Sequence, residues 1–137
     1  MTDAPQPMPG VTPHLVIRDN RAAEAIDFYT KAFGAEEGRR MLADDGKRIL
    51  HAHLTVAGGS LMLNDDFPEM AGGNAAGAPT GVTLHLDMPD ADAAWQKALA
   101  AGATERFPLA NQFWGQRYGQ VTDPFGHNWS IGGPLKP

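Results

Sequence analysis

Two kinds of hydrophobic spacing follow one another along the chain, and this order occurs twice. The segment 11–19, which includes Leu15 and Ile17, has the apolar content of a strand. In 21–33 the apolar residues recur every three or four positions, and Gly34 follows as a typical helix-ending residue. The pattern therefore predicts a strand followed by an amphipathic helix.

Further strands are expected after this helix. They are predicted at 39–43, 50–56 and 61–63. Turn residues separate them, with Asp-Asp-Gly at 44–46 and two glycines at 58–59. The first unit is thus expected to have the order strand, helix and three strands.

The same order is predicted again in the second half of the chain. The expected elements are a strand at 82–86, a helix at 90–101 ending at Gly102, and strands at 104–109, 116–122 and 127–131. Glycine, alanine and proline dominate the segment between the units, as in a linker. We therefore predict one α+β domain: a flexible tail (1–10), a first βαβββ module (11–66), a linker (67–80) and a second βαβββ module (81–134).

Each predicted module leaves one face of its sheet without a cover, because a single helix packs on only one side. Two modules that pair side by side would enclose a concave cleft between their sheets. Clefts of this kind are where small molecules usually bind. We therefore expect the functional residues to face this cleft.

Composition excludes several functions. The chain has no cysteine, so disulfides, thiolate metal sites and cysteine nucleophiles are ruled out. A net charge of −5 is unfavourable for binding nucleic acid. No apolar run is long enough for a membrane span, and the first ten residues lack the features of an export signal, so we expect a cytoplasmic protein. No dinucleotide-binding or Ser-His-Asp pattern is present.

Three segments resemble the vicinal oxygen chelate superfamily, which includes glyoxalase I, extradiol dioxygenases, fosfomycin-resistance enzymes and bleomycin-binding proteins. They are HLVI at 14–17, AIDFYTKAFG at 25–34 and DPFGHNW at 123–129, and FWGQRYG at 113–119 resembles the PhnB-like branch. The resemblance implies the glyoxalase/bleomycin-resistance fold and a homodimer. It leaves open whether the cleft walls come from one chain or from two.

The resemblance also implies where a metal ion would be held. Catalytic members use four cleft positions, which correspond here to His14, Met62, Gly81 and Ser130. Methionine is a weak ligand for hard or borderline cations, glycine has no side chain, and a serine hydroxyl is a poor replacement for a carboxylate. We therefore expect no metal ion and no other cofactor, and we favour a protein that binds or sequesters a small organic molecule, such as a drug.

Other histidines leave two enzyme hypotheses open. Strand alternation puts His51 and His53 on the face opposite Leu50, and the same parity would let His85 converge with them and with His14. Such a shifted set could hold a divalent metal in a lyase, isomerase or dioxygenase. Alternatively, His14 or His53 could act as a general base without a metal.

Aromatic residues gather in the last quarter of the chain. Trp114 and Tyr118 are the leading candidates for contact with a ligand, whereas Trp129 is expected in the core. Arg117 could fix a ligand carboxylate or phosphonate. The complete set of predicted ligand-binding residues is His14, His51, His53, Met62, His85, Trp114, Arg117, Tyr118 and Ser130.

Overall fold

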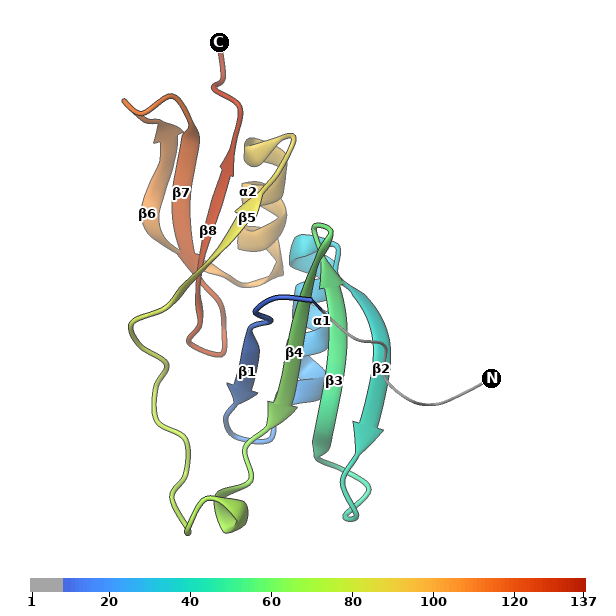
Figure 1. Cartoon of the computed structure of the whole chain (residues 1–137). Coiled ribbons are helices and arrows are strands. Elements are labelled where there is room, and N and C mark those ends of the chain that lie inside the picture. The colour runs from blue at the N-terminus through green and yellow to red at the C-terminus, as the bar shows by residue number, and fades with distance from the viewer. Residues whose placement is uncertain (1–8) are drawn as a thin grey trace.

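The computed structural model describes residues 9–137. It contains two four-stranded sheets and two α-helices (Figure 1). In chain order the elements are β1 (His14–Ile17), α1 (Ala22–Phe33), β2 (Glu36–Leu42), β3 (Ile49–Val56), β4 (Gly59–Asp65), the 3₁₀ helix η1 (Pro68–Met70), β5 (Thr83–Asp87), α2 (Ala91–Ala101), β6 (Thr104–Asn111), β7 (Arg117–Thr122) and β8 (Asn128–Gly133). Most of the tail predicted at 1–10 lies outside the described residues.

The two halves have the same topology. The strand orders are β1-β4-β3-β2 and β5-β8-β7-β6. In each sheet the first strand runs parallel to the last strand of its module, and the other neighbours are antiparallel. This arrangement confirms the predicted α+β fold of two tandem βαβββ modules.

Several strand boundaries differ from the prediction. β1 has only four residues, because Asp19 and Asn20 adopt positive φ angles of 63° and 58°, which end the extended backbone. The helix boundaries agree more closely. α1 ends at Gly34, which has a φ of 69° and donates its N–H to the carbonyl of Thr30 at 3.1 Å.

Strand alternation predicted the wrong face for Leu50. Leu50 was expected on the apolar face of its strand, but it is 40% exposed, whereas Ile49 is buried. The register of β2 and β3 shifts at this point: Met41 pairs with His51 and Leu42 pairs with Ile49. Leu50 is therefore the extra residue of a bulge, which reverses the faces of the residues before it.

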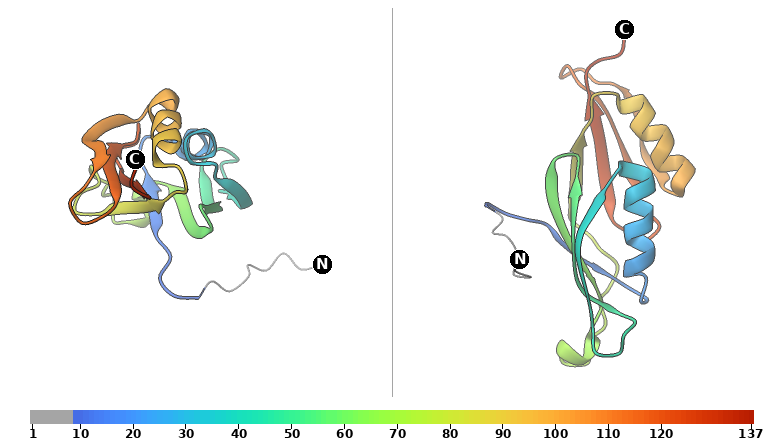
Figure 2. Two further views of the ribbon diagram at one scale, coloured as in Figure 1. Left: turned by 90° about the horizontal axis from the view of Figure 1, so that it is seen from above. Right: turned by 90° about the vertical axis from the view of Figure 1, so that its right-hand side faces the viewer.

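Both helices lie on the same side of the sheets and pack against each other (Figure 2). Their buried residues meet the apolar faces of the strands, and Trp129 of β8 belongs to this core, as predicted. The Phe33 ring of α1 lies 4.7 Å from the Trp129 ring, between centroids. The modules are thus joined through the helix layer, and the opposite faces of the sheets are left uncovered by helices.

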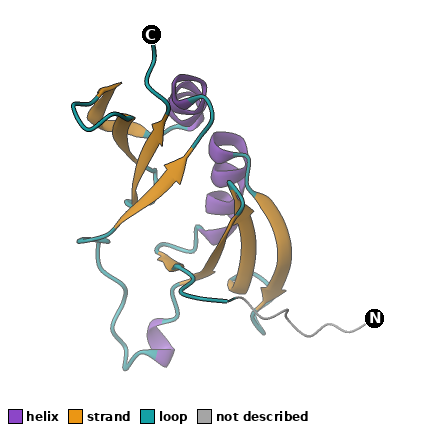
Figure 3. Ribbon diagram, turned by 45° about the horizontal axis from the view of Figure 1, so that its top comes forward, coloured by secondary structure: helices purple, strands orange, loops and turns teal. Residues whose placement is uncertain are grey.

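The segment between β4 and β5 is a long loop with one short helix, η1 (Figure 3). The Arg48 guanidinium lies 4.3 Å from the centre of the Phe67 ring and pairs with Glu69 at 2.7 Å. These contacts attach the start of the linker to the β2–β3 hairpin. Phe67 therefore anchors the linker.

Candidate ligand-binding site

The uncovered face of the first sheet carries a row of ligand-type side chains. The strand register aligns His14 with Met62, and Met62 with His53. In the next row, His51 lies beside His14, with a distance of 6.3 Å between ring centroids. Asn64, two residues after Met62, hydrogen-bonds through Oδ1 to Nε2 of His14. We call these five residues the histidine surface.

The environment of His51 favours its neutral imidazole. Partial burial lowers the pKa of His51, and the charges that His14 and His53 would carry when protonated lower it further. The Nε2 atom of His53 is buried and has no hydrogen-bond partner among the described residues. The surface thus combines a histidine of lowered pKa with a buried, unpaired ring nitrogen.

The uncovered face of the second sheet is aromatic. The ring of Tyr118 stacks on His85, with 5.9 Å between centroids and 17° between planes. Trp114 packs edge-on against Tyr118 at 5.5 Å and is 50% exposed. Buried Ser130 holds the imidazole of His85 through a hydrogen bond of 2.7 Å to Nδ1. We call His85, Trp114 and Tyr118 the aromatic surface.

The aromatic surface has a polar border. Its side chains were not predicted from the sequence. Gln120 donates from Nε2 to the Tyr118 hydroxyl at 3.0 Å. Gln116 accepts a hydrogen bond from the Trp114 indole at 3.2 Å and donates to Asp87 at 3.4 Å. Strand alternation was the available signal for Gln120, which follows Tyr118 by two residues and therefore shares its face. The same rule would have found Asn64 from Met62.

Within residues 9–137 of one chain, the four histidines do not form a group that could hold a metal ion. His85 belongs to β5, whose partner is β8 of the second sheet, so its neighbours are Ser130 and Tyr118. The other three histidines lie on the first sheet. Parity assigns a residue to a face of its own sheet, and it does not bring the faces of two sheets together.

Gly81 was expected in the first strand of the second module, but it precedes β5 and lies two residues before its first residue, Thr83. Its φ of 78° is left-handed, which is incompatible with an extended strand. Within β5, the residue that pairs with Ser130 is His85. The correspondence drawn from the resemblance was therefore misplaced by the length of the connection before β5.

Arg117 does not serve the aromatic surface. Its Nε and Nη2 atoms donate to the two carboxylate oxygens of Asp92 in α2, at 2.7 and 2.8 Å. Arg117 and Tyr118 are adjacent in β7, so their side chains leave opposite faces of the sheet. Arg117 also holds the pKa of Asp92 below its ordinary value. It is a link between helix and sheet in this structure, so the predicted ligand contact would require Arg117 to leave Asp92.

The side chains fit a divalent metal ion poorly. Of the four positions implied by the resemblance, His14 offers an imidazole, and so does His85, which takes the place of Gly81 in β5. Met62 and Ser130 are weak donors, and Nε2 of His14 already bonds to Asn64. Residues 9–137 contain no group of three His, Cys, Asp or Glu side chains arranged to hold a metal ion. Within one chain, neither the positions implied by the resemblance nor the shifted histidine set forms such a group among these residues.

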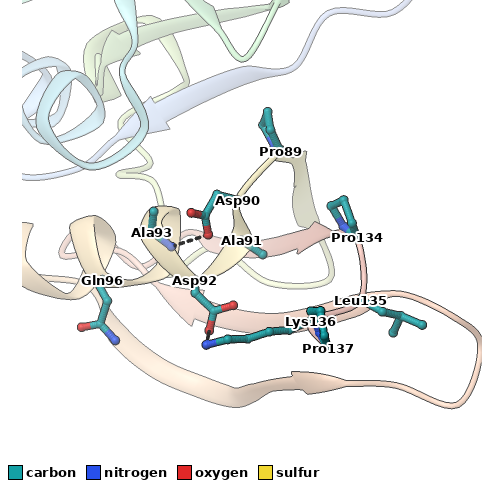
Figure 4. A pocket seen from close by; sticks show the side chains of 10 residues that line it. All are labelled: Pro89, Asp90, Ala91, Asp92, Ala93, Gln96, Pro134, Leu135, Lys136 and Pro137. Atoms are coloured by element: carbon teal, nitrogen blue, oxygen red, sulfur yellow. Dashed lines mark hydrogen bonds and ion pairs between the residues drawn. The ribbon is translucent and has the colours of Figure 1, made fainter.

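One cavity is separate from both surfaces. It has a volume of about 540 Å³ and lies between the start of α2 and the C-terminal segment (Figure 4). Asp90 caps the helix there by accepting the N–H of Ala93 at 3.1 Å, and Lys136 approaches Asp92 at 3.9 Å. None of the residues predicted to bind a ligand lines it. Its charged side chains pair with other groups of the protein: Asp90 caps α2, and Asp92 and Lys136 form an ion pair.

Comparison with known proteins agrees with this fold. An uncharacterized protein of Mycobacterium bovis is 51% identical over 133 residues, which cover 93% of this chain and 85% of the relative. The X-ray structure of an Arabidopsis thaliana gene product superposes with a TM-score of 0.71 and 31% identity, covering 90% of this chain and 98% of that one. A PhnB protein from Bacillus cereus shares the fold, with a TM-score of 0.67, 20% identity and coverage of 90% and 98%.

The helices and the family match also bear on the class of protein. Within the described part of the chain, no helix has the length and apolar character needed to cross a membrane. Residues 12–131 match the family model described as Glyoxalase/Bleomycin resistance protein/Dioxygenase superfamily. With most of its length matched and the tandem βαβββ topology observed, this chain belongs to the glyoxalase/bleomycin resistance protein/dioxygenase superfamily.

Proposed function

We propose that this protein binds a small organic molecule on the aromatic surface, as a drug-binding or sequestration protein. The observation that carries the proposal is the near-parallel stacking of His85 and Tyr118, with the half-exposed Trp114 ring against Tyr118. Aromatic rings that stay accessible on an uncovered sheet face are typical of sites for planar organic ligands. A planar ligand would stack against this surface.

The polar border would orient such a ligand. The amides of Gln116 and Gln120 both donate and accept hydrogen bonds, and the exposed carboxylate of Asp87 accepts them. With Arg117 engaged by Asp92, that guanidinium is not free to bind a ligand carboxylate. The surface therefore favours a neutral or cationic ligand over an anionic one.

The proposed binding requires no divalent metal ion. Met62 and Ser130 stand where catalytic relatives would supply stronger donors, and a thioether or a neutral hydroxyl binds such ions weakly. The alternative, a metal-dependent lyase, isomerase or dioxygenase, needs several histidines on one ion. Residues 9–137 of one chain contain no group of three His, Cys, Asp or Glu side chains that could hold such an ion, which favours the metal-free proposal over that alternative.

We also propose that the protein is a cytoplasmic homodimer. Apolar side chains exposed on β1, β2 and β6, among them Val16, Leu42 and Phe107, would be covered by a second copy. Light scattering after gel filtration should give twice the chain mass of 14.6 kDa. A monomeric mass at micromolar concentration would reject the dimer, and cell fractionation tests the location.

A planar fluorescent probe, 9-aminoacridine, tests the ligand-binding proposal. Tyr118→Ala removes the central ring and should weaken binding by about tenfold or more, because one stacked aromatic pair contributes on the order of 1 kcal/mol beyond its buried area. Arg117→Gln is the matched control, since it changes the adjacent residue on the opposite face. Equal affinity in the wild type and in Tyr118→Ala would reject the aromatic surface as the site.

A further inference from the structure

A second cavity lies at the seam between the two modules. Its volume is about 390 Å³, and its walls come from β1, the linker, β5 and the start of β8. Leu15 and Val16 contribute one wall, and Val82 and Leu84 contribute another. Neither Trp114, Tyr118 nor His85 takes part, so this seam pocket is distinct from the aromatic surface.

The linker forms the remaining wall, and its position there is supported by close packing. Pro79 lines the pocket, and its Cδ atom lies 3.3 Å from where a Cβ on Gly126 would be. Gly126 belongs to the turn that immediately precedes His127. The contact therefore holds the linker against the turn that carries the polar end of the pocket.

The chemistry of the walls selects for a neutral molecule. Most lining residues are apolar or lack a polar side chain, and none of them is Asp, Glu, Lys or Arg; the titratable groups in the lining are the imidazoles of His14 and His127. The volume falls within the usual range for small-molecule sites. An ionised ligand would lose its hydration without gaining a charged partner, which is costly.

His127 supplies an unused hydrogen-bonding atom at this wall. Its Nε2 atom is buried and has no partner among the described residues. Burial lowers the pKa of His127 and outweighs the opposing effects of Asp123 and of a hydrogen bond between the ring and the backbone of Val16, and nearby Arg18 lowers it further. The imidazole is therefore neutral at pH 7, and Nε2 is either a donor or an acceptor according to the tautomer. A buried polar atom without a partner is unfavourable, so a ligand that pairs with it gains free energy.

We propose that the seam pocket is a second binding site, for a neutral and mostly apolar molecule that carries one hydroxyl group. A hydroxyl both donates and accepts, so it pairs with His127 Nε2 in either tautomer. The apolar body of the ligand would lie between the Leu15 and Leu84 walls. Occupation of the pocket would also fix the linker against both modules.

The test uses 2-naphthol as the probe and isothermal titration calorimetry at pH 7. All measurements are made in the Tyr118→Ala background, in which stacking on the aromatic surface is weakened, so that the two proposals fail separately. Val82→Trp fills the pocket from a position that is 64% exposed, so folding should tolerate it. Met70→Trp is the control, because Met70 is an exposed linker residue outside the pocket.

The proposal predicts binding that Val82→Trp weakens by about tenfold or more and that Met70→Trp leaves unchanged. 2-Methoxynaphthalene can only accept a hydrogen bond, and His127→Phe removes the nitrogen. Each change should reduce affinity by about tenfold if Nε2 accepts, and His127→Phe alone should do so if Nε2 donates. Binding that is equal in Val82→Trp or in His127→Phe would overturn the proposal, as would no binding at millimolar probe. A Val82→Trp protein of altered oligomeric mass would instead identify the seam as a contact between copies.

Discussion

The Tyr29 hydroxyl of α1 donates a hydrogen bond of 2.6 Å to Asp123, in the turn between β7 and β8. The same carboxylate accepts the indole N–H of Trp129 at 2.9 Å and the backbone N–H groups of Phe125 and His127. The hydrogen bonds to Tyr29 and to Trp129 are both buried. One carboxylate thus connects the helix of the first module to the last hairpin of the second and sets the relative position of the two sheets.

The first prediction concerns this connection. Tyr29→Phe should lower the free energy of unfolding by about 1–3 kcal/mol, because it removes a buried hydroxyl that pairs with a charged group. Burial, together with Asp123, raises the pKa of Tyr29 well above its ordinary value, so the hydroxyl is a donor throughout the physiological range. Urea denaturation measures the change. Tyr118→Phe, which alters a half-buried hydroxyl, should cost no more than about 0.5 kcal/mol, and equal losses would contradict this account.

A second prediction concerns the approach of α2 to its sheet. A Cβ on Gly119 would lie 2.7 Å from the Cα of Leu109 and 2.8 Å from the Trp95 ring. Gly119→Ala must therefore displace backbone and ring, and it should destabilise the protein by about 1–3 kcal/mol. Gly77→Ala is the control, since a Cβ there meets no atom within 4 Å. Thermal or urea unfolding that shows no difference between the two variants would exclude close packing at Gly119.

The histidine surface predicts a pH dependence. Since burial lowers the pKa of His51 below 6.5, the unfolded chain takes up a proton at this residue before the folded protein does. Its contribution to stability is full above pH 6.5 and is lost as the pH falls through the folded pKa. The wild type should accordingly lose more stability between pH 7 and 5 than His51→Gln does.

Proton NMR titration provides the direct check on His51. The imidazole signal should titrate below pH 6.5 in the wild type. In His14→Ala the pKa of His51 should rise only in part, because burial, the larger cause, is retained. A pKa of His51 above 6.5 in the wild type would contradict the described environment.

Arg117 yields a prediction that separates structure from binding. Arg117→Gln breaks the two-pronged pair with Asp92 and should lower the midpoint of thermal unfolding, with a smaller effect in high salt. Affinity for 9-aminoacridine should stay within about twofold of the wild type, since this side chain leaves the opposite face of the sheet. A large loss of affinity with unchanged stability would restore Arg117 as a ligand contact.

The fold could be predicted from the sequence because its signals are local. The apolar spacing of α1 and the glycine at its end required no knowledge of distant residues, and the repeated order gave the two modules. The exposure of Leu50 was not predicted because a bulge depends on the pairing with the neighbouring strand. One extra residue in a strand reverses the face to which the residues before it point. The ends of β1 depended in the same way on the positive φ angles that follow it.

The site was predictable only within each sheet. Tyr118 and Trp114 were found as aromatic candidates, and His14, His53 and Met62 do share one row of the first sheet. The location of His85 was missed because it depends on how the modules pack, which strand parity does not encode. The pairing of Arg117 was missed for a related reason: its partner, Asp92, lies in α2, 25 residues earlier in the chain.

The central claim is that an aromatic surface binds an organic ligand without help from a divalent ion. The most direct test compares the dissociation constant of 9-aminoacridine before and after dialysis against EDTA, with metal content measured on the same samples. We predict the same constant in both samples, and loss of binding in Tyr118→Ala. Binding that disappears with EDTA and returns on addition of a stoichiometric divalent metal ion would contradict the claim.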